Sequence, residues 1–210
     1  MISKNQLVTQ YISNKKEINK KLTQFKQLQN KGDKEWTEEL IFCIFAANSS
    51  ASMGLKAVEL VKPYLQAREK EKIQQALRGK VRFYNIRAKY LLYNLNIIDN
   101  LPNGFYNEIT KLKGFHEKRL HIKHLFKGIG NKEASHLLRN LGYSGYAIID
   151  KHILNTLQQL ELTKTTISPK TYDEYIQIEE LIKNLATELN INMDALDLVM
   201  WSNITGEIIK

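Results

Sequence analysis

The chain has 210 residues, enough for one medium-sized domain or two packed lobes with a buried core. Hydrophobic residues make up 43% and charged residues 25%, ordinary globular values that argue against disorder. The formal net charge is +9. Because excess positive charge attracts polyanions, nucleic acid is the leading candidate partner, and a basic protein without such a role is the alternative.

The only cysteine, Cys43, lies in the apolar run 40–45. A single cysteine excludes an intramolecular disulfide, a cysteine-ligated iron–sulfur cluster and a zinc ribbon, and it favours a reducing compartment. We therefore expect a cytoplasmic protein with no metal or other cofactor. The first residues lack the apolar core of a signal peptide, and the longest apolar run, 40–47, is too short to span a bilayer, so no membrane partner is expected.

Apolar residues recur at helical spacing, as in Leu181, Leu185 and Leu189, and period-two alternation is scarce. The fold class predicted is all-α. Helices are expected over residues 4–29, 35–47, 52–66, 67–78, 83–96, 104–112, 115–126, 131–141, 151–160, 172–189 and 194–203.

Several helix ends carry recognisable signals. Residues Thr171 to Glu174 have the capping-box pattern that starts a helix. Gly142 follows Leu141 as a C-terminal stop, and Asp194 suits the N-cap of the last helix.

The most informative segment, 126–135, holds two glycines, Gly128 and Gly130, on either side of Ile129. Glycine tolerates positive φ, so the pair permits a sharp turn between two helices with Ile129 tucked between them. The turn and the next helix's N-terminus would expose backbone N–H groups to a phosphate oxygen. Most such turns bind nothing, but the flanking helices and basic residues strengthen this interpretation.

The sequence Gly128-Ile129-Gly130-Asn131-Lys132-Glu133-Ala134 resembles the hairpin of the helix-hairpin-helix superfamily of DNA glycosylases, whose pattern is Gly-(apolar)-Gly-x-Lys-x-Ala. Asp150 lies eighteen positions after Lys132, and together with His152 it matches the superfamily's Asp-x-His pattern. The longer stretches Gly128–His136 and Ala147–Leu154 are similar to the second family of 8-oxoguanine DNA glycosylases, found in archaea and some bacteria. The strong part of this resemblance covers residues 126–156 and the last ten residues.

The resemblance implies two helical lobes with the hairpin at a DNA cleft. The central lobe would span about 33–137, and the second lobe about 1–32 plus 138–210. The expected partner is double-stranded DNA containing 8-oxoguanine or abasic sites, bound by a monomer. The implied activities are a DNA N-glycosylase that excises 8-oxoguanine and an abasic-site lyase.

The resemblance assigns catalysis to Lys132 and Asp150. A neutral lysine amine can attack the anomeric carbon, and the resulting Schiff base permits β-elimination. Such a lysine must lose its proton, which burial or nearby cations such as Lys127, Arg139 and Lys151 would favour. A carboxylate near the sugar stabilises the cationic transition state. If each residue is considered alone, the alternative for Lys132 is a solvated lysine in a first helical turn, and the alternative for Asp150 is an N-cap without a catalytic role.

Two further residues match positions that contact DNA. His152 is expected to contact a phosphate, and a partly buried structural histidine is the alternative. Asn48 matches the residue that fills the gap left by an extruded base, here called the wedge. The alternative for Asn48 is a helix C-cap, because asparagine tolerates left-handed φ.

The C-terminal segment resembles the tail of the same family, in which a tryptophan lines the base pocket. The matching residues are Trp201 and Lys210, whose terminal carboxylate could accept a hydrogen bond from the N7–H that oxidised guanine carries. Phe83 and Tyr84 are weaker candidates for a second stacking face. The alternatives are core packing for Trp201 and a frayed terminus for Lys210.

Other members of the superfamily fit less well. Endonuclease III and the adenine glycosylases usually carry a four-cysteine cluster, and the eukaryotic-type 8-oxoguanine enzymes add an N-terminal β-rich domain. Two alternatives stay open: a glycosylase for another oxidised base, and a non-catalytic module that only grips DNA. The second would explain Gly128 and Gly130 but not the pairing of Lys132 with Asp150.

Overall fold

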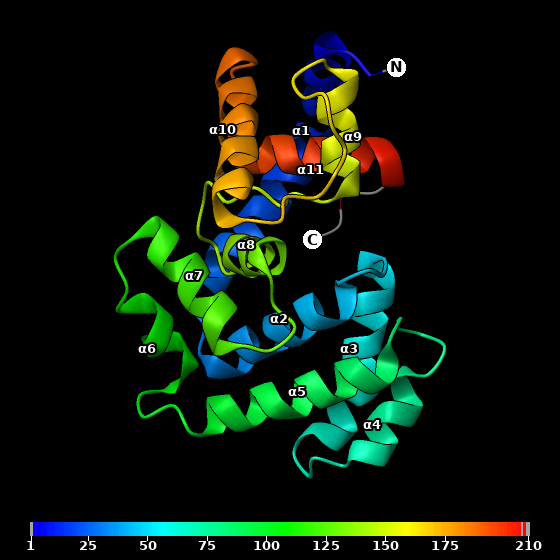
Figure 1. Ribbon diagram of the computed structural model, residues 1–210, viewed down its shortest axis with the longest axis vertical. Helices are drawn as coiled ribbons and strands as arrows, with labels where there is room; N and C mark the ends of the chain where they lie inside the picture. Colours follow the sequence, from blue (N-terminus) through cyan, green and yellow to red (C-terminus); the bar gives the residue numbers. More distant parts are fainter. Residues whose placement is uncertain (1, 207, 209–210) are drawn as a thin grey trace. The chain divides into compact units, whose positions relative to one another are not determined.

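The computed structural model describes residues 2–206 and 208, over which the chain forms eleven α-helices and no strand (Figure 1). The helices are α1 Lys4–Leu28, α2 Asp33–Ala46, α3 Ala51–Leu65, α4 Lys70–Leu77, α5 Tyr84–Asp99, α6 Gly104–Thr110, α7 Phe115–Leu125, α8 Asn131–Asn140, α9 Lys151–Gln159, α10 Tyr172–Glu188 and α11 Met193–Thr205. The all-α prediction is confirmed. Within the described residues, no helix combines the length and apolar character needed to cross a membrane.

The predicted helices are all present, and the largest differences lie at the start of α4 and at the end of α5, which reaches Asp99 rather than residue 96. Helix α4 begins at Lys70, whereas the sequence predicts a start at 67. Arg68 adopts a left-handed φ of +53°, and its backbone N–H bonds to the Leu65 carbonyl. A left-handed residue cannot continue a right-handed helix, so the chain turns at Arg68.

The helix ends confirm two of the three predicted signals. Thr171 forms the capping box with Glu174. Gly142, at φ +83°, ends α8 in a turn where it donates to the Arg139 carbonyl and Tyr143 donates to the Leu138 carbonyl.

The Asp194 prediction is wrong. Asn192 caps α11, because its Oδ1 accepts the backbone N–H groups of Asp194 and Ala195. The Asp194 carboxylate instead accepts the Gly145 N–H at 2.9 Å. Asparagine and aspartate are equally good N-caps, so only the tertiary contact decides between them.

The chain divides into two compact units. The terminal unit comprises Met1–Gln29 and Leu138–Lys210, and the central unit comprises Asn30–Leu137. In the terminal unit, α11 packs against α1, α9 and α10 (Figure 1). Its buried core draws on all four helices and includes Leu7, Leu154, Leu185 and Val199.

The central unit is organised around α2, which packs against α3, α5 and α6. The helix is buried from Leu40 to Ala46, because its side chains there are apolar on all sides, and the polar Glu39 before them is buried as well. Trp36 lies edge-on to Phe105, with ring centroids 5.6 Å apart. Phe105 in turn lies edge-on to Phe126 at 5.0 Å, so this aromatic chain ties the start of the hairpin turn to the core of the central unit.

Candidate active site

The segment 126–130 forms the predicted turn between α7 and α8. Ile129 is only 5% exposed, so its side chain is buried as the sequence predicts. Gly128 adopts a φ of +79°, a left-handed conformation that glycine reaches without strain. The hairpin is therefore present as the sequence predicts.

Asn94, on α5, clamps the turn. Its side chain accepts the Lys127 N–H at 2.8 Å and donates to the Lys127 carbonyl at 2.9 Å. The side chain is fully buried, where an unpaired amide would be costly. The ammonium of Lys127 lies 4.1 Å from the centroid of the Tyr93 ring, also on α5. Two adjacent residues of α5, Tyr93 and Asn94, thus hold Lys127 at the start of the hairpin turn.

Gly128→Ala is expected to destabilise the protein by about 2 kcal/mol or more, because two costs add. A Cβ at Gly128 would clash with the Tyr90 ring, and the left-handed φ strains any other residue. Gly79→Ala is the matched control, because Gly79 has φ +71° and nothing within 4 Å of its Cβ position. Urea unfolding of both variants measures the difference. Equal losses in the two variants would show that the Tyr90 contact carries no cost.

Lys132 occupies the first turn of α8, just after the hairpin, and its side chain is 24% exposed. Its ammonium lies 3.6 Å from a carboxylate oxygen of Glu133. The other oxygen of Glu133 accepts the Gly130 N–H at 3.2 Å. A carboxylate thus lies beside the Lys132 ammonium, and Glu133 occupies one of the N–H groups expected to face a phosphate.

Arg87 links this region to the turn after α2. It is 6% exposed and donates from Nη2 to the Ala47 carbonyl at 3.2 Å. Burial lowers the pKa of the Arg87 guanidinium, and the Glu133 carboxylate opposes that shift. A buried guanidinium is held in place by its partners, so Arg87 connects the residue before Asn48 with the start of the hairpin helix.

Asn48 and Phe83 are exposed residues with left-handed backbones. Asn48 follows the C-cap of α2, with φ +58°, which fits the predicted C-cap role without excluding a wedge. Phe83 precedes α5 with φ +57°, and its side chain is 60% exposed. A large aromatic ring in solvent is available for stacking. Tyr84 is the first residue of α5 and is partly buried.

Asp150 is the N-cap of α9, as the sequence predicts. Its Oδ1 accepts the N–H groups of His152 at 2.8 Å and Ile153 at 2.9 Å. Both bonds end on one oxygen, so the cap does not use the second carboxylate oxygen. The ring of His152 contacts the half-buried ring of Trp201, with centroids 5.6 Å apart. Three of the predicted site residues therefore lie together where α9 meets α11.

The carboxyl group of Asp197 is buried and interacts electrostatically with Asp150. The pKa of Asp197 is raised to about 7, chiefly by burial, with a smaller upward effect from the carboxylates of Asp150 and Asp194, while the Arg139 guanidinium opposes the shift. Asp197 lies 3.8 Å from Arg139, which is itself 4% exposed. This pair joins the end of α8 to α11 within the terminal unit.

The predicted site residues fall into two groups. The central unit holds Asn48, Phe83, Gly128, Gly130 and Lys132. The terminal unit holds Asp150, His152 and Trp201, and Lys210 lies outside the described residues.

Sequence reasoning missed Asn94, Glu133 and Arg87. Glu133 has a local signal, because a glutamate three places after Gly130 suits a capping contact. Asn94 and Arg87 have none. Among the described residues, no group of three or more His, Cys, Asp or Glu side chains is arranged to hold a metal ion.

Comparison with known proteins adds independent evidence. The sequence matches the family described as 8-oxoguanine DNA glycosylase over residues 18–191. The 8-oxoguanine DNA glycosylase/AP lyase of Methanocaldococcus jannaschii is 32% identical over 197 residues, covering 92% of this chain and 91% of that protein. The enzyme of the same name from Thermoplasma volcanium is 37% identical over 194 residues, with the same shares covered.

Solved structures agree with the sequence matches. The M. jannaschii 8-oxoguanine glycosylase/lyase, crystallised with a 15mer DNA containing 8-oxoguanine, superimposes with a TM-score of 0.84 at 31% identity, covering 97% of this chain and 99% of that one. The 8-oxoguanine DNA glycosylase of Thermotoga maritima gives a TM-score of 0.88 at 27% identity, covering 99% and 98%. The hairpin, the lysine that follows it and the aspartate at the start of α9 thus occur in a chain that belongs to the 8-oxoguanine DNA glycosylase family.

Proposed function

We propose that this protein excises 8-oxoguanine from duplex DNA and then cleaves the strand at the abasic site. The observation that carries the proposal is the placement of Lys132. It follows the hairpin directly, on the first turn of α8, with a side chain that is partly exposed. Family membership supplies the substrate class, since relatives over nine-tenths of the chain are 8-oxoguanine DNA glycosylase/AP lyases.

In the proposed reaction, the Lys132 amine attacks C1′ of the damaged nucleoside, and the bond from C1′ to the base nitrogen breaks. The base leaves and takes up a proton. Loss of the ring oxygen bond to C1′ then gives a Schiff base between C1′ and Nζ. Removal of a proton from C2′ expels the 3′ phosphate and cuts the strand. Asp150 stabilises the positive charge that develops on the sugar.

The remaining predicted residues are assigned to DNA binding. Gly128, Gly130 and His152 would contact phosphates, Asn48 would fill the gap left by the extruded base, and Phe83 and Trp201 would line the base pocket. A phosphate at the Gly130 N–H must displace the Glu133 carboxylate that now accepts from it. Cys43 is the single cysteine of the sequence and is buried, and we propose the reducing cytoplasm as the compartment and a monomer as the working form.

The test is an excision assay over a panel of duplexes carrying 8-oxoguanine, other oxidised bases, or an abasic site. Preferred excision from the 8-oxoguanine duplex, followed by strand cleavage, is the expected result. Borohydride, which reduces a Schiff base, should trap a covalent adduct on the abasic duplex. If the protein excises only another oxidised base, that base is the substrate in place of 8-oxoguanine. If it binds DNA without excision, cleavage or an adduct, it is a non-catalytic binding module.

The terminal carboxylate of Lys210 is proposed to help recognise the lesion by accepting its N7–H. Adding two alanines after Lys210 would replace this charge with a neutral peptide group. Losing a buried hydrogen bond to a charged group costs on the order of 1.5–3 kcal/mol, or roughly ten- to a hundred-fold in excision rate. Single-turnover excision of 8-oxoguanine measures the change.

Cleavage at a ready-made abasic site is the reference for this experiment, because no base has to be recognised there. It should persist in the extended chain. Equal excision by the native and extended chains would remove Lys210 from the base pocket. Recognition would then rest on Trp201 and on groups that the sequence does not single out.

A further inference from the structure

Side chains of α10 and α11 hold the buried segment of the chain that leads into Asp150. Residues 146–149 are non-helical and at most 3% exposed. Their backbone N–H groups donate to side chains: Ala147 to Glu179 at 2.9 Å, Ile149 to the Tyr175 hydroxyl at 3.4 Å, and Ile148 to the carboxyl group of Asp197. A buried backbone N–H without a partner costs free energy, so these side chains fix the path of the segment.

Asp197 differs from the other side chains of this set because its charge also acts on Asp150. It is 3% exposed, and three charged groups from different parts of the unit act on it. These are Arg139 on α8, Asp150 at the start of α9 and Asp194 on α11 itself. The Arg139 guanidinium lies over the Phe25 ring of α1, 4.7 Å from its centroid. Asp197 and Asp150 thus form a pair of interacting carboxyl groups inside the terminal unit.

The geometry of this pair favours a proton on Asp197 and a negative charge on Asp150. Oδ2 of Asp197 lies 3.8 Å from Arg139 Nη2 and has no hydrogen-bond partner among the described residues. A buried carboxylate with such an oxygen is costly, and a neutral carboxyl group is less so. Asp150, in contrast, accepts two N–H groups at the start of α9, an environment that stabilises negative charge.

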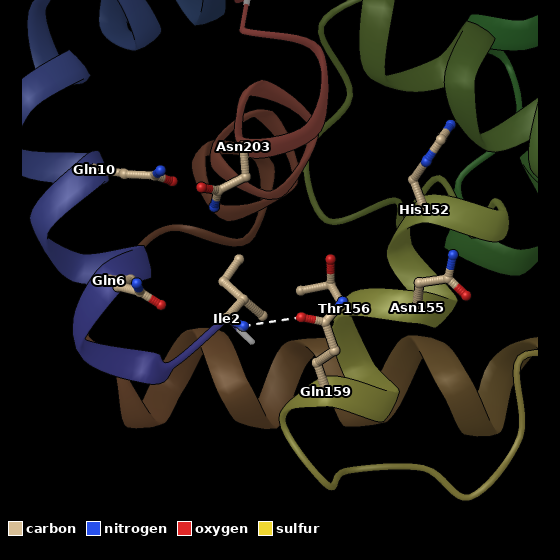
Figure 2. A pocket seen from close by; sticks show the side chains of 8 residues that line it. All are labelled: Ile2, Gln6, Gln10, His152, Asn155, Thr156, Gln159 and Asn203. Carbon is tan, nitrogen blue, oxygen red and sulfur yellow. Dashed lines mark hydrogen bonds between the residues drawn. The ribbon is translucent and has the colours of Figure 1, made fainter.

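Helix α11, which carries Asp197, packs against α9. One turn after Asp197, Trp201 contacts the His152 ring. His152 also lines a pocket of about 460 Å³, shown in Figure 2, whose other side chains include Gln10 of α1 and Asn203 of α11. Helix α11 therefore contacts the chain on both sides of Asp150, at Ile148 and at His152.

We propose that Asp197 is a positioning residue for base excision, which holds the segment that ends at Asp150 and adjusts the negative potential there through its own protonation. The inference rests on the function proposed above and deepens it. The pKa of Asp197 is about 7, so above that pH a second negative charge lies near Asp150. This charge adds to the field that stabilises the cationic sugar, and excision should become faster as Asp197 ionises.

The first experiment compares Asp197→Asn with the unmodified chain. Asparagine keeps an oxygen for the Ile148 N–H and stays neutral at every pH. Single-turnover excision of 8-oxoguanine is measured for both proteins across neutral pH, and the ratio of the two rates cancels the titration of Lys132. The ratio should be about one below pH ~6 and rise about threefold or more above pH ~8, because one pKa unit of interaction is a factor of ten. A ratio that does not change with pH would overturn the electrostatic role.

Thermal unfolding gives a readout that does not depend on catalysis. A carboxyl group whose pKa is raised by folding stabilises the protein fully below its unfolded-state pKa of about 4, and this contribution is lost as the pH rises to about 7. The melting temperature of Asp197→Asn should therefore rise relative to that of the unmodified chain across this range. A constant difference in melting temperature would show that Asp197 does not hold the proton, and would overturn the inference.

The second experiment tests the hydrogen bond to the segment. Asp197→Ala removes the acceptor of the Ile148 N–H, so excision in mildly acidic buffer should fall about tenfold, whereas Asp197→Asn should keep its rate. If the alanine variant fails to fold, Asp197→Leu fills a similar volume without an acceptor and takes its place. Equal rates in the variants with and without the acceptor would overturn the positioning role.

Glu179→Gln is the matched control. It also replaces a buried carboxylate by an amide on the same segment, at the Ala147 N–H, but Glu179 is not among the groups that act on Asp197. Its rate relative to the unmodified chain should not change with pH. The same pH dependence as in Asp197→Asn would show that the effect does not belong to Asp197.

The outcomes separate this inference from the proposed function. If the unmodified chain excises 8-oxoguanine and the rate ratio for Asp197→Asn is independent of pH, the inference fails and the proposed function stands. If the unmodified chain excises no 8-oxoguanine, the proposed function fails, and the role of Asp197 in excision fails with it, even where the melting temperatures show the expected dependence on pH.

Discussion

Lys132→Gln is expected to abolish strand cleavage and borohydride trapping, a loss of at least about a thousandfold, because an amide cannot form a Schiff base. Folding should be nearly unaffected. The change removes an ion pair with Glu133 between side chains that are 24% and 18% exposed, and such pairs contribute little to stability. Binding to a duplex with a stable abasic-site analogue should persist. Gel analysis of the trapped adduct and a binding titration measure the two properties.

Lys183→Gln is the control for the loss of a lysine. Lys183 lies on α10, its side chain is 63% exposed, and its ammonium is 3.3 Å from the Glu180 carboxylate. This substitution therefore also removes a weak ion pair. This variant should trap the adduct as efficiently as the unmodified chain. An adduct that still forms with Lys132→Gln would mean that another amine is the nucleophile.

Asp150→Asn is expected to slow base excision by orders of magnitude with little change in melting temperature. Asparagine keeps the oxygen that accepts the N–H groups of His152 and Ile153, so α9 stays capped. It loses the negative charge that stabilises the cationic sugar in the transition state. Single-turnover excision and thermal unfolding, measured on the same preparation, separate the two effects.

Asp150→Ala provides the comparison for stability. It removes the cap as well as the charge, and losing such a cap costs about 1 kcal/mol. Its melting temperature should therefore fall, whereas that of Asp150→Asn should not. Normal excision by Asp150→Asn, together with a lowered melting temperature, would assign Asp150 a purely structural role.

The secondary structure could be predicted from the sequence because its signals are local. Helical spacing of apolar residues predicts all eleven helices, with ends within a few residues of those observed. The hairpin is also local, since Gly128, Ile129 and Gly130 are adjacent and their backbone requirements follow from residue type. The same holds for the capping role of Asp150, which depends on N–H groups two and three residues away.

The chemical environment of the site could not be predicted in the same way. The sequence suggested cations near Lys132 but gave no sign of the ion pair that its ammonium forms with the Glu133 carboxylate. Arg139, one of the expected cations, is buried against Asp197 in the terminal unit. Whether two charges meet depends on how helices pack, and helical periodicity contains no information about the partner helix.

What the sequence by itself determined is the set of helices, the hairpin and the family pattern of Lys132 and Asp150. Only the tertiary structure decided that Asn94 clamps the hairpin and that Gln10 and Asn203 share a pocket. Asn94 and Lys127 are 33 positions apart, and Gln10 and Asn203 come from opposite ends of the chain. Contacts between residues so far apart depend on the packing of the whole unit, because each buried polar group must find its partner in the folded chain.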